Sequence, residues 1–426
     1  MLRDIKEKMR SGMGKDVIWT FTLQITIMLC TFAVNKLLAS RLSIDDFGQY
    51  NVIKRSVQVL SFVMLAGIGI ALPRYIPLYR KGYQTKPITP LIAASFIYII
   101  GVTITVIFVC CLFCEEMQLL ILGSSGKIQL LIISLAYAFT LAIAQFIYAY
   151  YRGLGNFKWF NGAQLGIQLA IVLPLLFLPI LTTTTVFVSW LMITAMLVII
   201  YFVREIWLHP FVSQNSFTTS SLIIELKTIM KYSSGRLLAD FFLFTFAAFP
   251  LIFISNTRGL QTTAFFSVGI TFVTMVTPLF SFMGIILLPY VSECIAKKDM
   301  KSANHFVNRL AILYVFFSLL IMAVLFIFIN FFTSFFFSGS YLITTDISRI
   351  MILSLLPQAI YRLYRNPIDA ISVIPYNTII LGACLFLMII TFFLSTTLTQ
   401  LALAYLCVSC LQGLLSWLTW QFIKSK

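Results

Sequence analysis

Long segments without charged side chains constrain the fold of this chain most. The two longest run from Trp159 to Val203 and from Ala370 to Ile423. A helix that crosses a bilayer needs about 20 apolar residues, so each segment must hold two spanning helices. Strands of a membrane β-barrel are only about 9–11 residues long and alternate in polarity, which excludes a barrel. Further uncharged segments cover residues 17–35, 87–114, 128–151, 259–292 and 310–345.

The composition agrees with a membrane protein. Hydrophobic residues make up 60% and charged residues 10% of the chain, against about 45–50% and 25% in soluble globular proteins. The net charge of +16 raises the question of nucleic-acid binding, which requires a clustered basic face. The 30 Lys and Arg are instead scattered over short loops, so we expect a lipid bilayer and no nucleic acid as partner.

The hydropathy pattern predicts an all-α polytopic membrane protein with about twelve transmembrane helices. With a cytoplasmic N-terminus, 22 Lys and Arg fall in inner loops and tails, and the outer loops carry only Arg41, Lys127, Arg258 and Arg349. This asymmetry satisfies the positive-inside rule and predicts that both termini are cytoplasmic. The expected helices are 16–40, 50–72, 88–113, 129–151, 160–180, 184–207, 231–255, 262–288, 309–332, 345–364, 375–395 and 400–422.

An internal repeat divides the chain into two halves. Tyr50-Asn51-Val52 and Leu72-Pro73 recur at one constant offset as Phe266-Ser267-Val268 and Leu288-Pro289. Six helices per half make the repeats parallel, and transporters of this kind bind substrate between the halves. We therefore expect an N-terminal bundle at 1–208, a cytoplasmic linker at 209–230 and a C-terminal bundle at 231–426.

No metal site or cofactor site is expected. Zinc sites need converging thiolate and imidazole ligands. The CxxC pairs lie in apolar helices and the two histidines lie in inner loops, at Cys111/Cys114, Cys407/Cys410, His209 and His305. We therefore interpret the cysteines as small packing residues.

Several short segments resemble a known family. The segment Ala39-Ser40-Arg41-Leu42 followed by Asp46-Phe47-Gly48-Gln49-Tyr50 is similar to the signature of Wzx-type polysaccharide flippases in the multidrug/oligosaccharidyl-lipid/polysaccharide exporter superfamily. The similarity continues through Leu65 to Arg74, Arg152 to Lys158, and Leu288-Pro289-Tyr290 with Glu293. We interpret Asp46 as the N-cap of the second helix, and Gly67 and Gly69 as permitting close helix packing.

The resemblance implies a MATE-like fold and transport without catalysis. The implied substrate is an undecaprenyl-pyrophosphate-linked oligosaccharide, such as an O-antigen repeat unit for lipopolysaccharide, moved across the bacterial inner membrane by alternating access. A polysaccharide polymerase and a chain-length regulator are the implied protein partners. Two alternatives stay open: a cation-coupled multidrug exporter of the same superfamily, and a membrane glycosyltransferase or polymerase.

Cations inside the expected helices are the candidate substrate ligands. Lys36 ends the first helix, and Lys54 and Arg55 lie in the second. At the offset of the repeat these positions are Ile252, Ile270 and Thr271, so only the N-terminal half is charged there. Lys54 and Arg55 either face the lumen or extend to the outer surface. In flippases that this chain resembles, a cationic cavity receives the pyrophosphate, which implies that role for Lys36, Lys54, Arg55 and Arg236.

Polar residues of the first helix are the candidate ligands for the sugar. Thr20, Gln24, Thr31 and Asn35 follow one another at steps of four, seven and four residues, which places them within a sector of about 60° at about 100° per residue. A stripe this narrow faces protein or water. We therefore assign sugar binding to Gln24 and Asn35.

Asp240 is the acid that the predicted helices place deepest in the membrane. Arg236 precedes it by one helical turn and can pair with it. One hypothesis is a structural ion pair. The other is that protonation of Asp240 frees Arg236 and couples proton entry to transport.

Overall fold

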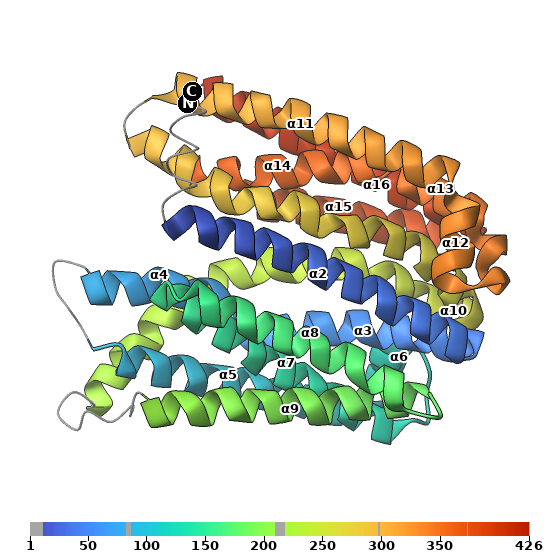
Figure 1. Cartoon of the computed structure of the whole chain (residues 1–426), viewed down its shortest axis with the longest axis horizontal. Helices are drawn as coiled ribbons and strands as arrows, with labels where there is room; N and C mark the ends of the chain where they lie inside the picture. Colours follow the sequence, from blue (N-terminus) through green and yellow to red (C-terminus); the bar gives the residue numbers. More distant parts are fainter. Residues whose placement is uncertain (1–11, 82–86, 209–217, 297–298, 373, 426) are drawn as a thin grey trace. The chain divides into compact units, whose positions relative to one another are not determined.

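The computed structural model describes residues 12–81, 87–208, 218–296, 299–372 and 374–425, and these are almost entirely helical (Figure 1). No strand occurs in these ranges. The α-helices are α2 (Gly12–Arg41), α3 (Ile44–Leu65), α4 (Ile68–Lys81), α5 (Thr89–Leu112), α6 (Cys114–Leu122), α7 (Ile128–Leu154), α8 (Phe157–Phe177), α9 (Thr183–Leu208), α10 (Thr219–Ala296), α11 (Met300–Ile327), α12 (Ile329–Phe337), α13 (Thr345–Ile352), α14 (Leu355–Ile371), α15 (Tyr376–Leu394) and α16 (Leu398–Ser425), and a 3₁₀ helix, η1 (Gly339–Thr344), precedes α13.

Twelve crossings can be assigned within the described ranges. Ten helices there are long and apolar enough to span a membrane, and the pair Gly339–Ile352 and Leu355–Ile371, bent by 43°, forms one more. α10 counts among the ten, but Gly259 interrupts it with φ 83° and ψ 173°, a backbone conformation that glycine adopts readily. Because that break turns α10 into two crossings, the prediction of an all-α protein with about twelve spans is confirmed.

The repeat seen in the sequence extends to the helices. α6 begins at residue 114 and α12 at residue 329, and both have 9 residues. α9 and α16 begin at residues 183 and 398, which are separated by the same interval. α7 (Ile128–Leu154) corresponds to α13 and α14 together, from Thr345 to Ile371. The two halves therefore repeat one helix order, down to a short helix after the third long one.

The second helix begins six residues earlier than expected. The Ser43 hydroxyl accepts from the backbone N–H of Asp46 at 3.1 Å and donates to its carboxylate at 2.8 Å. The Ser43 hydroxyl thus satisfies a backbone N–H at the start of the helix, which makes Ser43, not Asp46, the N-cap. Since α3 starts at Ile44, Lys54 lies about 15 Å along the helix at 1.5 Å per residue.

Two helices are broken in the middle, one in each half. Between α3 and α4, Ala66 has φ 53° and Gly67 has φ 76°. Between α13 and α14, Leu353 and Ser354 donate to carbonyls only three residues earlier. Pro357 follows this second break, and a proline removes the N–H that would bond to the carbonyl four residues before it.

The chain forms two compact units. The first comprises Met1–Leu23 and Gln49–Phe244, and the second comprises Gln24–Gly48 and Thr245–Lys426. α2 and α10 each pass from one unit to the other. Part of the expected linker, 209–217, lies outside the described residues, and 219–230 form the start of α10. The boundaries expected at 208 and 231 stay a prediction.

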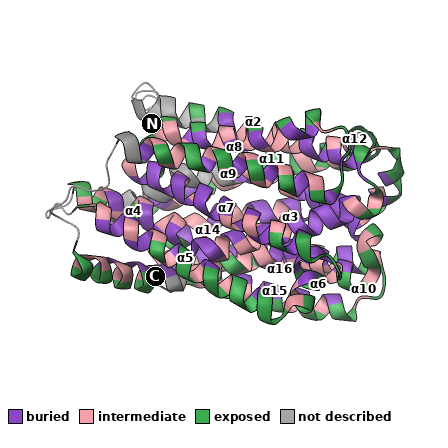
Figure 2. Ribbon diagram, turned by 90° about the horizontal axis from the view of Figure 1, so that it is seen from below, coloured by how far each residue is buried: buried purple, intermediate pink, exposed green. Residues whose placement is uncertain are grey.

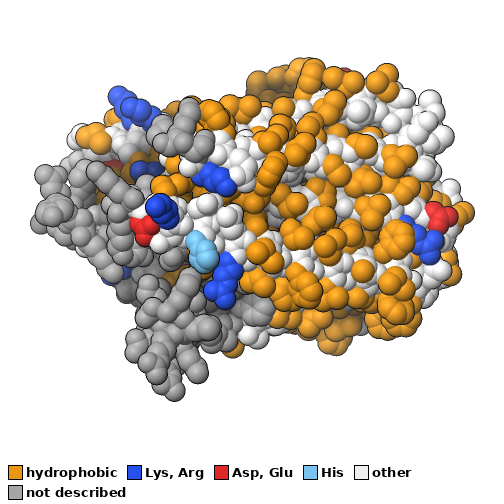
Figure 3. Space-filling model, turned by 90° about the horizontal axis from the view of Figure 1, so that it is seen from above, with side chains coloured by type: hydrophobic (Ala, Val, Ile, Leu, Met, Phe, Trp, Pro, Cys, Tyr) orange, Lys and Arg blue, Asp and Glu red, His pale blue; other side chains and the backbone are white. Residues whose placement is uncertain are grey.

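Burial along the helices distinguishes packed helices from lipid-facing ones (Figure 2). In the most hydropathic stretch of α7, 67% of the residues are buried, against 17% in the corresponding stretch of α11. Apolar side chains cover most of the described surface in Figure 3, and charged ones there are few. A contiguous apolar surface of this kind marks contact with a membrane or a partner, and since α11 is also long and apolar enough to span a bilayer, we infer that helices such as α11 face lipid.

Candidate functional site

Lys54 lies against an aromatic cluster of the first unit, and Arg55 is its neighbour in α3. The Lys54 ammonium is 5.4 Å from the centroid of the Tyr50 ring, and Tyr50 is 0% exposed. Tyr50 packs on Phe187 and Trp190 with ring centroids 6.1 and 5.9 Å away. A cation over a buried ring is held by the ring quadrupole. Both cations are half-buried, and their exposure to a lumen stays a prediction.

The break between α3 and α4, which follows these cations, is held by contacts from α7. Pro73 has no N–H, so the helix leaves the carbonyl of Gly69 without its usual donor. The Arg152 guanidinium, near the end of α7, donates to this carbonyl at 2.5 Å. At Gly153, a Cβ atom would lie 3.0 Å from the Leu72 carbonyl oxygen. The residues around Pro73 and Arg152, which carry the family resemblance, therefore meet at one broken helix.

The interpretation of Gly67 as a packing residue agrees with its surroundings. A Cβ atom there would lie 3.0 Å from the Ser233 backbone oxygen and Cβ of α10. Ser233 is 0% exposed. Because Gly67 also has a positive φ, it serves both the break and the close approach of α10.

Lys36 and Asn35 belong to the second unit, whereas Lys54 and Arg55 belong to the first. Lys36 is exposed, and its ammonium lies 3.8 Å from the centroid of the Phe335 ring in α12. Asn35 is 0% exposed and donates to the Thr31 carbonyl at 2.8 Å. Gln24 is half-buried in the same helix.

Arg236 and Asp240 both lie in α10. The Arg236 side chain lies outside the described residues, while Asp240 is half-buried and makes polar contacts. The ion pair between the two side chains stays a prediction.

Arg362 is a half-buried cation that was not among the candidate site residues. The helix expected to end at residue 364 continues as α14 to Ile371, which places Arg362 nine residues, or about 14 Å, from its end. Tyr314, Tyr405 and Arg365 lie close enough to act on its charge. The repeat could have predicted this depth. The equivalent helix α7 ends at Leu154, whose counterpart in the repeat is Ala370, so the helix that carries Arg362 could have been expected to continue to about that residue.

A polar interface connects α14 with α16. Gln358 is 9% exposed and donates to the Tyr405 hydroxyl at 2.9 Å and to the Ser409 hydroxyl at 3.4 Å. Further along α16, Gln412 and Ser416 are 2% and 0% exposed. Buried amides and hydroxyls are costly in a membrane unless they are hydrogen-bonded, as Gln358, Tyr405 and Ser409 are here.

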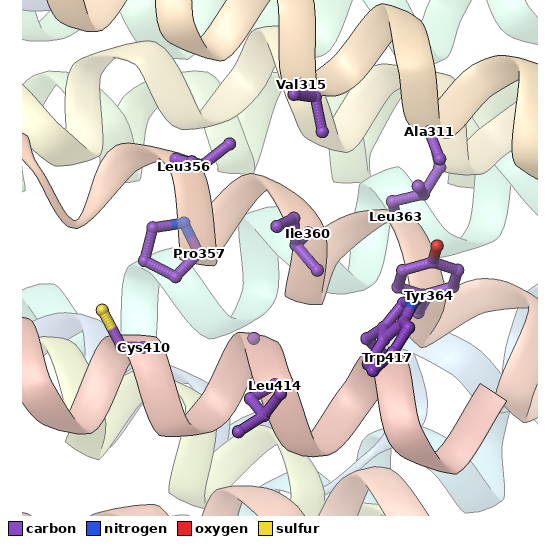
Figure 4. A pocket seen from close by; sticks show the side chains of 11 residues that line it. Ala311, Val315, Leu356, Pro357, Ile360, Leu363, Tyr364, Cys410, Leu414 and Trp417 are labelled. Atoms are coloured by element: carbon purple, nitrogen blue, oxygen red, sulfur yellow. The ribbon is translucent and has the colours of Figure 1, made fainter. Parts of the chain in front are cut away.

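The opposite face of α14 is apolar. It borders a groove of about 460 Å³ between α11, α14 and α16 (Figure 4). At its α14–α16 side the helices touch closely, since a Cβ on Gly413 would lie 2.7 Å from the Pro357 carbonyl oxygen. The groove is lined by Ala311, Val315, Leu356, Pro357, Ile360, Leu363, Tyr364, Cys410, Gly413, Leu414 and Trp417.

Two buried carboxylates of the first unit were also missed. Glu205 accepts from the Tyr151 hydroxyl at 2.7 Å and pairs with Arg204 at 2.7 Å. Glu225 accepts from the Tyr79 hydroxyl at 2.7 Å. Both have hydrogen-bonded partners, as structural carboxylates do. Within the described ranges, no group of three or more His, Cys, Asp and Glu could hold a metal ion.

Comparisons with known proteins identify the family. The family described as "Polysaccharide biosynthesis protein" matches residues 13–295, and no curated protein matches the chain. Three solved structures share the fold. The inward-facing MATE multidrug resistance transporter of the MOP superfamily aligns with a TM-score of 0.76 at 12% identity, covering 96% of this chain and 98% of that one. The lipid II flippase MurJ aligns with a TM-score of 0.71 at 16% identity, covering 95% and 87%.

The third structure is a MOP superfamily transporter from Pyrococcus furiosus, whose binding pocket is described as having reverse polarity. It aligns with a TM-score of 0.66 at 13% identity, covering 96% of both chains. These identities establish a common fold. The family match covers well over half of the chain, so this multi-pass membrane protein belongs to the polysaccharide biosynthesis protein family.

Proposed function

We propose that the protein is a flippase that moves an undecaprenyl-pyrophosphate-linked oligosaccharide across the bacterial inner membrane. The cargo is an O-antigen or a related repeat unit, moved from the cytoplasmic to the periplasmic leaflet by alternating access. The observation that carries the proposal is a pair of neighbouring cations, Lys54 and Arg55, on a membrane-spanning helix, with Lys54 over the ring of a buried tyrosine. Cations retained inside a span are costly and mark an anionic substrate or an ion path.

The family match supports a saccharide as part of the cargo, and the shared fold supports movement of that cargo across the membrane. Residues 13–295 match a family named for polysaccharide biosynthesis, and the lipid II flippase shares the fold. Lys54, Arg55, Lys36 and Arg236 would attract the pyrophosphate, while Gln24 and Asn35 would contact the sugar. Transport makes and breaks no bond, so no cofactor is needed.

The membrane potential suffices to drive this direction. Moving one elementary charge across 100 mV is worth about 2.3 kcal/mol. A pyrophosphate of charge about −2 that leaves a negative interior therefore gains about 4–5 kcal/mol. An ion antiport is not required, and the cation-coupled exporter is disfavoured because cationic drugs would be repelled by Lys54 and Arg55.

Deletion and complementation test this function. Cells that lack the protein should accumulate lipid-linked repeat units on the cytoplasmic face and lose long-chain surface polysaccharide. The wild type should restore the chains, and Lys54→Gln with Arg55→Gln should not, at equal membrane levels. The exposed Lys158→Gln serves as the control. Normal chains in the double variant would overturn the role of these cations.

Orientation is tested by labelling with a thiol reagent that does not cross membranes. In a cysteine-free background, Ser125→Cys should react from the periplasm and Ser302→Cys should not. The reverse pattern would contradict both the cytoplasmic termini and the direction of transport.

A further inference from the structure

Arg362 and Arg365 lie on one side of α14. Three residues correspond to about 300° of rotation and about 4.5 Å of rise at ideal helix geometry, so the two side chains leave the helix close together in direction. Ile360, which borders the apolar groove, lies two residues before Arg362 and so projects from nearly the opposite side of the helix. The two guanidinium groups therefore point away from the groove.

Polar side chains that are fixed by hydrogen bonds surround this pair. Gln358 lies one turn before Arg362, and its amide donates to the Tyr405 hydroxyl at 2.9 Å. Tyr405 and Tyr314 are close enough to Arg362 to act on its charge. Tyr314 is fixed in place by a hydrogen bond from its hydroxyl to the Phe280 carbonyl at 2.5 Å. Arg362 and Arg365 are like charges three residues apart on one helix, an arrangement that repels, and an oxyanion between them would relieve that repulsion.

The position within a broken helix is a second, independent observation. α14 begins directly after the break at Leu353 and Ser354. Residues 137 and 138, the equivalents of this break in the first half, lie inside the continuous helix α7. Broken helices in transporters bring polar groups to substrate at mid-membrane. The repeated helix order does not require this break, because α7 is continuous at the same place. We therefore attribute the break to a role of this helix in the second half.

The equivalent positions in the first half carry no charge. Arg362 and Arg365 correspond to Phe146 and Ala149, which are 4% and 2% exposed. The fold is therefore satisfied by apolar side chains at both places. The arginines are an addition specific to the second unit, as Lys54 and Arg55 are to the first.

We propose that α14 carries a second oxyanion site, in which Arg362 and Arg365 bind a phosphate or carboxylate group beside the hydrogen-bonded pair Gln358 and Tyr405. This site belongs to the second unit and is distinct from the Lys54–Arg55 pair. The identity of its ligand as part of a lipid-linked saccharide rests on the proposed function. Arginine suits the role because its planar fork binds two oxygens of one oxyanion.

Anion binding to the full-length protein in lipid nanodiscs tests the site. Inorganic pyrophosphate is the probe, measured by titration calorimetry. Wild type should bind at two sites, and Arg362→Gln should lose one of them, with affinity there at least tenfold weaker. Lys54→Gln with Arg55→Gln should lose the other. Arg349→Gln, whose parent side chain is already paired with Asp346 at 3.0 Å, should bind as wild type does.

Two further arms make the result decisive. Glucuronate that competes with pyrophosphate in wild type but not in Arg362→Gln would assign a sugar carboxylate to the site, and lack of competition would assign a phosphate. If Arg362→Gln does not fold, Arg362→Lys keeps the charge and should still weaken one site. Binding identical to wild type in the folded Arg362 variant would overturn the proposal.

The outcome is separable from that of the proposed function. Pyrophosphate binding that depends on Arg362, in a protein that does not restore surface polysaccharide, would refute the flippase and keep the site. Restored polysaccharide together with unchanged pyrophosphate binding in Arg362→Gln would refute the site and keep the flippase.

Discussion

The two halves place their half-buried cations on different helices of the same repeated fold. In the first half, Lys54 and Arg55 lie on α3, before the break at Ala66 and Gly67. In the second half, Arg362 lies on α14, after its break. In each case the helix that carries the cations is broken and its counterpart is not. Charge and helix breaks therefore go together, and neither is required by the repeated helix order.

The surroundings of the two cation pairs also differ. Lys54 rests on Tyr50, which packs on Phe187 and Trp190. Arg362 adjoins a hydrogen-bonded interface in which Gln358 donates to Tyr405. An aromatic face holds a cation without occupying its donors, whereas amide and hydroxyl groups can bind a ligand together with it. The difference suggests capture of charge at the first pair and more directional contacts at the second.

The largest expected effect comes from moving a charge to the half that lacks it. Ile270 is the counterpart of Lys54 and is 0% exposed. Ile270→Lys would bury an uncompensated ammonium, which costs at least about 2.5–3.5 kcal/mol in a membrane. We expect little folded protein by size-exclusion chromatography, and normal amounts for Ile270→Leu. A well-folded Ile270→Lys variant would remove the basis for treating the asymmetry as functional.

A smaller loss of stability is expected when the hydrogen bond from Arg152 to the Gly69 carbonyl in α4 is removed. Arg152→Gln would leave the Gly69 carbonyl without the donor that Pro73 cannot supply, at a cost of about 1–3 kcal/mol. We expect faster hydrogen exchange in α4 and reduced transport, with Lys158→Gln as control. Exchange and transport equal to wild type would show that this hydrogen bond does not hold the break.

A gain of about 1 kcal/mol is expected at the break itself, because a left-handed backbone conformation disfavours residues with a Cβ by roughly 1–2 kcal/mol. Ala66 adopts that conformation, with φ 53°. Ala66→Gly should therefore raise the thermal midpoint, whereas Ala71→Gly in α4 should lower it. A lower midpoint for Ala66→Gly would mean that the conformation is not strained.

The smallest effect is expected at Asp240. Asp240→Asn keeps size and hydrogen bonding but abolishes titration, so a structural partner of Arg236 should lose little transport. Sensitivity to collapse of the proton gradient should stay as in wild type. Loss of that sensitivity in the variant would instead identify Asp240 as the coupling site.

Much of the fold follows from hydropathy, because each span must be apolar over a fixed length. The start of α3 was missed because the Ser43 N-cap begins the helix in polar sequence, ahead of the apolar pattern. Arg362 falls inside the expected helix 345–364 but only two residues from its end. Because α14 continues through Arg365 to Ile371 after the apolar pattern ends, Arg362 lies deeper in the helix than expected. Lys54 and Arg55 could be selected from sequence because the repeat supplied uncharged counterparts. Side-chain partners such as Arg152 with Gly69 depend on contacts between distant segments, which periodicity does not encode.

Translocation in reconstituted vesicles tests the central claim most directly. Proteoliposomes would carry a fluorescent undecaprenyl-pyrophosphate saccharide, and a membrane-impermeant reductant that bleaches the fluorophore irreversibly would report the fraction that reaches the outer leaflet. We predict complete bleaching with wild-type protein, and bleaching of half the signal, as in protein-free vesicles, with Lys54→Ile and Arg55→Thr, the residues of the other half. Bleaching of only half the signal with the wild type, or complete bleaching with the double variant, would contradict the account.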